Sequence, residues 1–371
     1  MIAIYKSMNT FIPISKPSIT EKEISYVTDA VSSTWISSLG KYIDRFEADF
    51  ATFCNVKYGV ATANGTVALH LALVALGIGE GDEVIIPDLS FIATVNTVLQ
   101  TGAVPVFADI DPYNLCIDPK AIEKVVTSST KAIIPVHLYG HPADMKAINE
   151  IALKYNLVVI EDAAEAHGAT INGQKVGSFG SCGCFSFYGN KNITTGEGGI
   201  ITTNSEALYH KLRYLRDHAM SKEKRYWHTE CGYNYRMTNM QAALGCAQMD
   251  RVDELLEQKK KIFKTYESYL NGVPGIRLNR TYDWATNAYW LVCLEIESYD
   301  EIKRDAFMQR LKESGVDSRP YFYPMSAMPY LKQADTPVTY ALSQRGVNLP
   351  TYFDLTGDEI KYICDVVKQS L

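Results

Sequence analysis

The sequence has no excess of positively charged residues. Its 371 residues include 36 lysines and arginines against 42 aspartates and glutamates, which gives a formal net charge of -6 at pH 7. A broad surface for nucleic acid or for an anionic membrane needs a basic footprint, so we expect neither partner. A local basic pocket for a phosphorylated small molecule is compatible with this charge.

Cysteine pairs with metal-binding spacing are also missing. The 8 cysteines are scattered along the chain and form no C-x-x-C pair. Cys182 and Cys184 are too close together for the usual zinc-knuckle spacing, so we predict no metal site. We interpret the cysteines as mostly buried, reduced thiols, which are typical of a cytoplasmic protein.

Long apolar runs and glycine-rich dinucleotide motifs do not occur either. The first residues, MIAIYKSMNTF, contain no charged segment followed by an apolar one, and no later run approaches the length of a membrane span. We therefore expect neither secretion nor membrane insertion. No G-x-G-x-x-G motif follows the first predicted strand, which disfavours a Rossmann-type dehydrogenase.

The sequence does contain a regular alternation of helices and short strands. The strands are apolar on both faces, which indicates a largely parallel sheet covered by helices. Strands are predicted at 83–86, 104–107, 132–136 and 157–160. Helices are predicted at 67–76, at 144–155, and up to about residue 100 from a cap at Ser90.

The length of the chain indicates a large domain and a smaller one. We predict a large α/β domain at residues 1–254, which includes an N-terminal helical segment, and a small C-terminal α+β domain at 255–371. Residues 239–270 have helical periodicity and few helix-breaking residues. They are predicted to form one long or bent helix that links the two domains.

Two segments place polar groups where α/β proteins bind ligands. Asn64, Gly65 and Thr66 open a predicted helix, whose free N–H groups and dipole favour an anion. A plain helix cap is the alternative interpretation. Glu161 and Asp162 follow a predicted strand, at the edge of the sheet where ligands collect. A carboxylate there can pair with a protonated ring nitrogen, or it can simply cap the next helix.

Two further segments offer an amine and an anion-binding group. Lys191 lies between a strand ending near Ser186 and the glycine cluster 196–199, so its ε-amino group can be held rigidly and partly desolvated. A lone loop lysine is more often a solvated surface charge. The segment 232–237 combines an amide, a guanidinium and two phenols, which suit phosphate and hydroxyl recognition, although a subunit contact is equally compatible.

Together these segments resemble one known family. The chain is similar to the pyridoxal-phosphate (PLP)-dependent sugar aminotransferases of the DegT/DnrJ/EryC1/StrS type from about residue 12 onward. The resemblance implies the type I PLP-dependent aminotransferase fold, a large domain with a mostly parallel mixed sheet plus a smaller C-terminal α+β domain. Six stretches carry it in order: NGTVALHLAL (64–73), DEVIIPDLSFIATVNTV (82–98), VHLYGHPADM (136–145), VIEDAAEAHGA (159–169), SFYGNKNITTGEGG (186–199) and GYNYRMTNMQAALG (232–245).

The resemblance implies roles for four residues around the cofactor. Lys191 would bind pyridoxal 5'-phosphate covalently and move the proton during transamination. Asp162 would pair with the pyridine nitrogen, and Phe91 would stack on the ring. Glu165 stands where many relatives have glutamine, near the phenolic oxygen of PLP. Two anionic oxygens there would repel each other, so Glu165 is either protonated or directed elsewhere.

The resemblance also implies a phosphate site that two subunits share. Gly65, Thr66 and Ser186 would hold the cofactor phosphate within one subunit. Asn234 would reach the phosphate of the neighbouring subunit's cofactor. A homodimer with shared active sites is therefore expected.

Within the family, residues 29–50, 215–237 and 318–330 resemble members that aminate GDP-4-keto-6-deoxymannose for surface polysaccharide, with L-glutamate as the donor. A UDP- or dTDP-linked keto sugar and an inactive regulatory relative are the alternatives. A sugar dehydratase is disfavoured because such relatives have histidine at the position of Lys191. Ser326 replaces a histidine that relatives often carry. Four basic residues are candidates for the substrate: Lys222, Arg225, Arg236 and Arg319.

Overall fold

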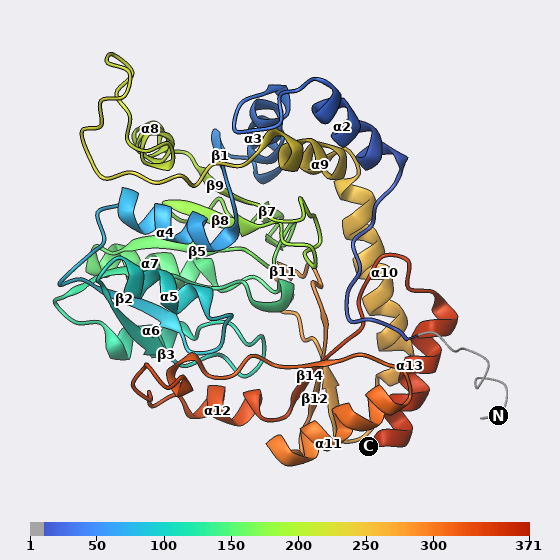
Figure 1. Ribbon diagram of the computed structural model, residues 1–371. Helices are drawn as coiled ribbons and strands as arrows, with labels where there is room; N and C mark the ends of the chain where they lie inside the picture. The colour runs from blue at the N-terminus through green and yellow to red at the C-terminus, as the bar shows by residue number, and fades with distance from the viewer. Residues whose placement is uncertain (1–10) are drawn as a thin grey trace.

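The chain folds around a seven-stranded sheet, which a computed structural model describes together with the rest of residues 11–371 (Figure 1). The expectation about a leader segment concerns residues 1–10, which lie outside the described residues. Among the seven strands β9 alone runs against the others, so the sheet is mixed but mostly parallel, as predicted. In spatial order the strands are β1 (Tyr58–Thr62), β9 (Gly199–Thr203), β8 (Cys182–Ser186), β5 (Val158–Asp162), β4 (Thr130–Ile133), β2 (Glu83–Pro87) and β3 (Val104–Ala108).

Helices cover both faces of this sheet because successive strand residues point to opposite sides. In β2, Ile85 joins the apolar cluster under one set of helices, whereas Ile86 joins the cluster under the other set. The first set contains α6 (Pro119–Val125) and α7 (Met145–Tyr155). The second set contains α4 (Gly65–Ala75), α5 (Ala93–Gln100) and α8 (Glu206–Arg216). The strands are thus buried on both faces, which explains their continuous apolar sequences.

Three helices cover the β1–β9–β8 end of the sheet and lie together in Figure 1. They are α2 (Glu21–Ser32), α3 (Lys41–Cys54) and α9 (Asn239–Met249). Phe46 and Phe50 of α3 pack against Phe185 and Phe187 of the β8 segment in a fully buried cluster. Aromatic rings of this size contribute much of the apolar area that a core buries.

A second, antiparallel sheet lies at the other end of the molecule (Figure 1). Its strands are β10 (Ile276–Leu278), β12 (Val292–Ile296), β14 (Gly346–Leu349) and β13 (Arg319–Pro320). An apolar cluster joins it to α10 (Val252–Leu270), α11 (Glu301–Glu313) and α13 (Gly357–Ser370). The remaining elements are β6 (Thr170–Ile171), β7 (Gln174–Lys175), β11 (Ala285–Thr286), α12 (Pro337–Ser343) and the short 3-10 helices η1 (Leu138–Gly140) and η2 (Met325–Ala327).

The expectation of one long or bent helix over residues 239–270 is right in its helical content and wrong in its continuity. The segment forms α9 and α10, which are separated at Asp250 and Arg251. Both residues are held by other parts of the chain: Asp250 pairs with Arg45, and Arg251 Nη1 lies 3.0 Å from Glu23 Oε1. These long-range contacts lie at the break, although the local sequence favours a continuous helix. The predicted division after residue 254 falls just inside α10 and stays a prediction.

No helix in residues 11–371 is long and apolar enough to cross a membrane.

Candidate active site

A cavity of about 590 Å³ lies at the carboxyl ends of β5 and β8, next to the first turn of α4. This is the edge at which open α/β sheets bind their ligands. Seven of the eight residues that the sequence assigned to the cofactor line this cavity, although they come from distant parts of the chain. They are Gly65, Thr66, Phe91, Asp162, Glu165, Ser186 and Lys191.

The first turn of α4 forms one wall of the cavity. Asn64 caps the helix, because its Oδ1 accepts a hydrogen bond from the N–H of Val67 at 3.0 Å. The N–H groups of Gly65 and Thr66 lie at the helix start, where backbone donors have no partner within the helix. A Cβ on Gly65 would come within 2.7 Å of the Cβ of Ser186, so only glycine fits here. The result is a tight cradle of donors for an anion.

The predicted cap at Ser90 is wrong. Helix α5 begins after Ile92, and Ser90 Oγ instead lies 3.0 Å from Thr94 Oγ1. Thr94 in turn donates to Asp162 Oδ2 at 2.8 Å. The sequence analysis missed Thr94 as a site residue. Its position four residues after Ser90, close to the start of α5 and beside the sheet edge, was the available signal.

Three ionisable groups share the floor of the cavity. Lys191 Nζ lies 3.7 Å from Glu165 Oε1, and both side chains are almost completely buried. Burial lowers the pKa of Lys191, although the neighbouring carboxylates Glu165 and Asp162 oppose that shift. Burial likewise raises the pKa of Asp162, and hydrogen bonds from Thr94 and from the N–H of Ala164 oppose it. Lys191 is therefore a buried amine made less basic, which suits nucleophilic chemistry.

Glu165 is held by the backbone of η1. Its Oε2 accepts a hydrogen bond from the N–H of Tyr139 at 2.9 Å. Burial raises the pKa of Glu165 to about 7, and the nearby amine of Lys191 is the main opposing influence. The carboxyl group thus faces the cavity and Lys191 rather than solvent, and it changes its charge near neutral pH.

Two aromatic residues from the second half of the chain complete the cavity. The Nζ of Lys191 lies 4.0 Å from the ring centroid of Trp290, whose Nε1 donates to the carbonyl of Asn190 at 2.8 Å. Phe322 lines the cavity opposite Phe91. The sequence analysis missed Trp290 and Phe322, because nothing in their local sequence indicates that they meet a lysine about a hundred residues earlier.

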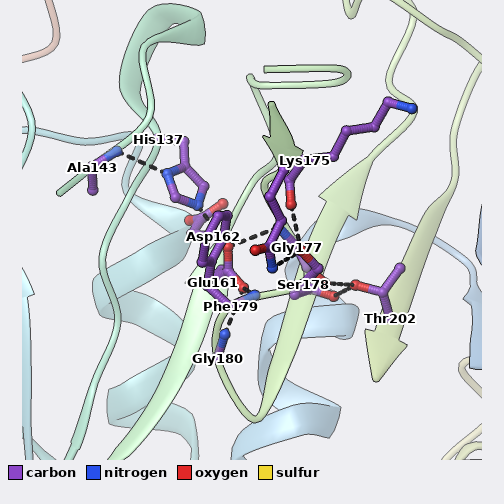
Figure 2. A network of polar contacts seen from close by, with 12 residues as sticks. His137, Ala143, Glu161, Asp162, Lys175, Gly177, Ser178, Phe179, Gly180 and Thr202 are labelled. Carbon is purple, nitrogen blue, oxygen red and sulfur yellow. Dashed lines mark hydrogen bonds and ion pairs between the residues drawn. The ribbon is translucent and has the colours of Figure 1, made fainter. Parts of the chain in front are cut away.

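A buried network behind the cavity fixes the end of β5 (Figure 2). The Glu161 carboxylate accepts hydrogen bonds from the N–H groups of Gly177, Phe179 and Gly180 at 2.7, 2.7 and 2.8 Å. It also lies 3.1 Å from Nε2 of His137. Adjacent strand residues point to opposite faces, so this anchor directs the neighbouring side chain of Asp162 into the cavity.

The tautomer of His137 follows from the same network (Figure 2). Its Nδ1 accepts a hydrogen bond from the N–H of Ala143 at 2.9 Å, so Nε2 carries the proton and donates to Glu161. The backbone N–H of His137 also donates to the carbonyl of Asp162 at 3.0 Å. Glu161 and His137 therefore support the cavity from outside it.

The other predicted site residues lie away from this cavity. Asn234 is exposed, and its Oδ1 accepts from Arg236 Nε at 3.0 Å, while Arg236 pairs with Asp217 at 2.7 Å. Lys222 and Arg225 line a separate surface hollow beside α8. The assignment of these residues, and of the exposed Arg319, to ligands stays a prediction.

Ser326 does not line this cavity. Its side chain is buried and bonds to Asp88 at 2.7 Å.

A desolvated lysine beside a buried aspartate at the edge of a mostly parallel sheet is the arrangement that PLP-dependent enzymes use to hold their cofactor. The model of the DegT/DnrJ/EryC1/StrS aminotransferase family matches residues 17–368. The chain therefore belongs to this family, and it is a PLP-dependent sugar aminotransferase.

Individual relatives agree with this assignment over nearly the whole chain. The chain is 42% identical to a GDP-perosamine synthase of Vibrio cholerae, over 96% of this chain and 98% of the relative. It is 45% identical to a GDP-perosamine synthase of Caulobacter vibrioides, over 97% and 98%. The solved aminotransferase of Psychrobacter cryohalolentis superposes with a TM-score of 0.89 at 34% identity, over 97% of this chain and 98% of the other.

The cavity fits the cofactor of this family. Its volume lies in the range typical of small-molecule sites. The cradle formed by Gly65 and Ser186 suits a phosphate, and Asp162 supplies a buried negative charge for a protonated pyridine. The buried Oδ1 of Asn190, which lines the cavity, has no hydrogen-bond partner within residues 11–371. PLP would supply a phosphate anion for the cradle and a protonated pyridine nitrogen for Asp162.

Proposed function

We propose that this enzyme transfers the amino group of L-glutamate to GDP-4-keto-6-deoxymannose, which gives 2-oxoglutarate and GDP-perosamine for a surface polysaccharide such as O-antigen. The observation that carries this proposal is the set of three relatives named GDP-perosamine synthase, which are 42%, 43% and 45% identical to this chain over nearly its full length. The cytoplasm is the proposed place of this reaction.

Lys191 is the proposed catalytic residue. PLP, when bound, withdraws electrons from the substrate carbon that carries the nitrogen. The Nζ of Lys191 would hold the cofactor covalently between turnovers and would carry the proton from one carbon to the other during them. Burial lowers the pKa of this amine, which makes its neutral, proton-accepting form easier to reach than in a solvated lysine. Trp290 limits the freedom of the side chain through its ring, 4.0 Å from Nζ.

The two carboxyl groups have different proposed roles. Asp162 would pair with the pyridine nitrogen and keep it protonated, because the carboxylate is buried and oriented by Thr94. Glu165 would lie beside the phenolic oxygen, where its neutral form can donate a hydrogen bond and its ionised form would repel the oxygen. A pKa raised to about 7 by burial makes the neutral form available.

The remaining cofactor contacts divide between the phosphate and the ring. Gly65, Thr66 and Ser186 would hold the phosphate at the start of α4, where the helix dipole favours an anion. Phe91 would stack on the ring; it is 55% exposed, which leaves its face free for a ligand.

A homodimer with shared active sites is the proposed assembly. Asn234 would reach the cofactor phosphate of the neighbouring subunit, and its exposure outside its own cavity supports that placement. Lys222, Arg225, Arg236 and Arg319 are proposed to bind the diphosphate or the sugar, since arginine can bond two phosphate oxygens at once.

The proposal predicts a preference for the GDP-linked acceptor. Purified enzyme with PLP and L-glutamate should show a higher kcat/KM for GDP-4-keto-6-deoxymannose than for UDP- or dTDP-linked 4-keto sugars. Lys191→Ala serves as the matched control and should form no product from any of them. A preference of about tenfold or more for a UDP or dTDP sugar, equivalent to about 1.4 kcal/mol in transition-state binding, would overturn the GDP assignment and leave the aminotransferase assignment intact.

A further inference from the structure

A buried carboxylate outside the cavity ties two of the cavity's walls together. Asp88 follows β2 and is fully buried. Its Oδ1 accepts from the N–H of Ser326 at 2.7 Å, and its Oδ2 accepts from the hydroxyls of Ser326 at 2.7 Å and Thr336 at 2.5 Å. All three donors belong to the segment that follows β13 of the small antiparallel sheet.

Backbone contacts reinforce this attachment. The N–H of Met325 donates to the carbonyl of Asp88 at 2.8 Å, and Leu89 forms an isolated antiparallel bridge with Pro324. Four hydrogen bonds, donated by Met325, Ser326 and Thr336, therefore converge on Asp88. Such a fully satisfied buried network specifies one geometry, because a shift would leave a desolvated carboxylate without partners.

Both segments carry an aromatic ring of the cavity wall. Phe91 lies three residues after Asp88, and Phe322 lies four residues before Ser326, and both line the cavity. Their ring centroids are 5.9 Å apart at an interplanar angle of 57°. The N–H of Phe322 also donates to the hydroxyl of Tyr139 at 2.9 Å. The Asp88 attachment and the facing rings thus belong to one short, rigid unit.

We propose that Asp88 is a positioning residue, which fixes the spacing between Phe91 and Phe322 and thereby holds the cavity ready for the PLP ring. The carboxylate touches neither cofactor nor substrate and acts through the two loops that flank it. The proposal depends on the PLP cofactor of the family and on the role of Phe91 proposed above. It does not depend on which nucleotide sugar is the acceptor.

A second carboxylate provides a matched control. Asp109 follows β3 and accepts hydrogen bonds at 2.9 Å from the N–H of Val338, the N–H of Thr339 and the hydroxyl of Thr339. It binds the segment that follows β13, as Asp88 does, and it also accepts from three donors. These donors belong to α12, and Asp109 does not line the cavity. Loss of either carboxylate removes a comparable anchor, and only Asp88 is adjacent to the two rings.

The test compares Asp88→Ala and Asp109→Ala by the dissociation constant of PLP from the apoenzyme, measured by equilibrium dialysis, and by thermal unfolding. Both variants should unfold at lower temperature. Asp88→Ala should weaken PLP binding about tenfold because the ring site is no longer preorganised, whereas Asp109→Ala should stay within about twofold of the wild type. Equal PLP affinities in the two variants would overturn the proposal.

A double-mutant cycle separates positioning from general destabilisation. Phe322→Ala removes the ring that the attachment is proposed to place, so Asp88→Ala should weaken PLP binding much less in that background than in the wild type. An unchanged effect in both backgrounds would contradict the proposal. If Asp88→Ala does not fold, Ser326→Ala takes its place. This variant removes one donor, and it should weaken PLP binding about threefold with the same dependence on Phe322. Wild-type affinity in Ser326→Ala would contradict the proposal.

Discussion

The charges of individual residues govern the chemistry of this site. Two carboxyl groups and one amine are almost completely buried next to one another, and the amine lies 3.7 Å from Glu165. Interactions between charges are stronger in such an environment than in water, and an uncompensated charge is costly. Without a cofactor, one positive amine and two negative carboxylates would leave an uncompensated negative charge at the floor of the cavity. One of the carboxyl groups is therefore expected to bind a proton, and Glu165 is the group whose pKa is raised to about 7.

Glu165→Gln should change how the stability of the PLP-free protein depends on pH. Folding raises the pKa of Glu165 from 4.5 to about 7, so between these values the native state binds a proton that the unfolded state has lost. The stability contributed by this group is therefore greatest at low pH and falls by about 3 kcal/mol as the pH rises through that range. Glutamine does not titrate, so the free energy of unfolding of the variant should fall less. Denaturant titrations across the range measure the difference.

The control for this prediction is Glu223→Gln, which changes an exposed glutamate in the 215–237 segment. It should leave the pH dependence of unfolding unchanged. If Glu165→Gln and the wild type lost stability in parallel, the raised pKa of Glu165 would be wrong.

At the scale of elements, the site depends on where helices begin and strands end. The start of α4 supplies the anion cradle, the last residue of β5 is Asp162, and the last residue of β8 is Ser186. The parallel arrangement brings these ends to one edge of the sheet. The start of α4 and the ends of β5 and β8 are each fixed by their own polar contacts. The cap of α4 can therefore be changed without changing the catalytic lysine.

Asn64→Ala should cost about 1 kcal/mol of stability, because the N–H of Val67 loses its capping partner. It should also weaken PLP binding, since the first turn of α4 is proposed to hold the phosphate. Asp144→Ala is the matched control: Asp144 caps α7 through Ala147 at 3.1 Å and lies outside the cavity. Urea unfolding should show similar losses for both variants, and only Asn64→Ala should raise the dissociation constant of PLP. Equal PLP affinities would disprove the role of this helix start.

Local patterns predicted most of the elements, and these patterns together with the family resemblance predicted seven residues of the cavity, all of them between Gly65 and Lys191. The strand ends at Asp162 and Ser186 and the helix start at Gly65 follow from apolar runs and from turn residues nearby in the sequence. Trp290 and Phe322 could not be predicted in this way, because the second sheet delivers them to the cavity through long-range packing. The break between α9 and α10 was also missed; the residues at the break contact partners far away in sequence, which local patterns do not reveal.

At the scale of the whole molecule, some of the residues predicted to bind the cofactor or the substrate lie on the surface, away from the cavity. Asn234 and the basic residues Lys222 and Arg225 lie on an exposed segment near α8, whereas Lys191 lies at the floor of the cavity. Within one chain, the exposed residues and Lys191 therefore lie apart, although the proposed reaction requires both at the same site. A homodimer in which each exposed segment serves the partner's cavity would reunite them.

Mixing two inactive variants tests this arrangement. Lys191→Ala subunits and Asn234→Ala subunits should each lack activity, and the mixture should regain part of it, because a hybrid dimer contains one site with both residues intact. Product formation from L-glutamate and the keto sugar provides the measurement, and tagged subunits with native mass spectrometry verify that hybrids form. Hybrids without restored activity would show that each subunit is self-sufficient in these residues.

The strand order also determines when this protein can acquire its cofactor during synthesis. Strand β1 pairs with β9, and Tyr58 lies opposite Thr203. This edge of the sheet can therefore form only after residue 203 has left the ribosome. The cavity draws on residues from Asn64 to Phe322, so most of the chain must emerge before PLP meets a complete binding site. Contacts between residues this distant in sequence form slowly. We therefore expect PLP to bind a nearly finished fold and to play no part in its nucleation.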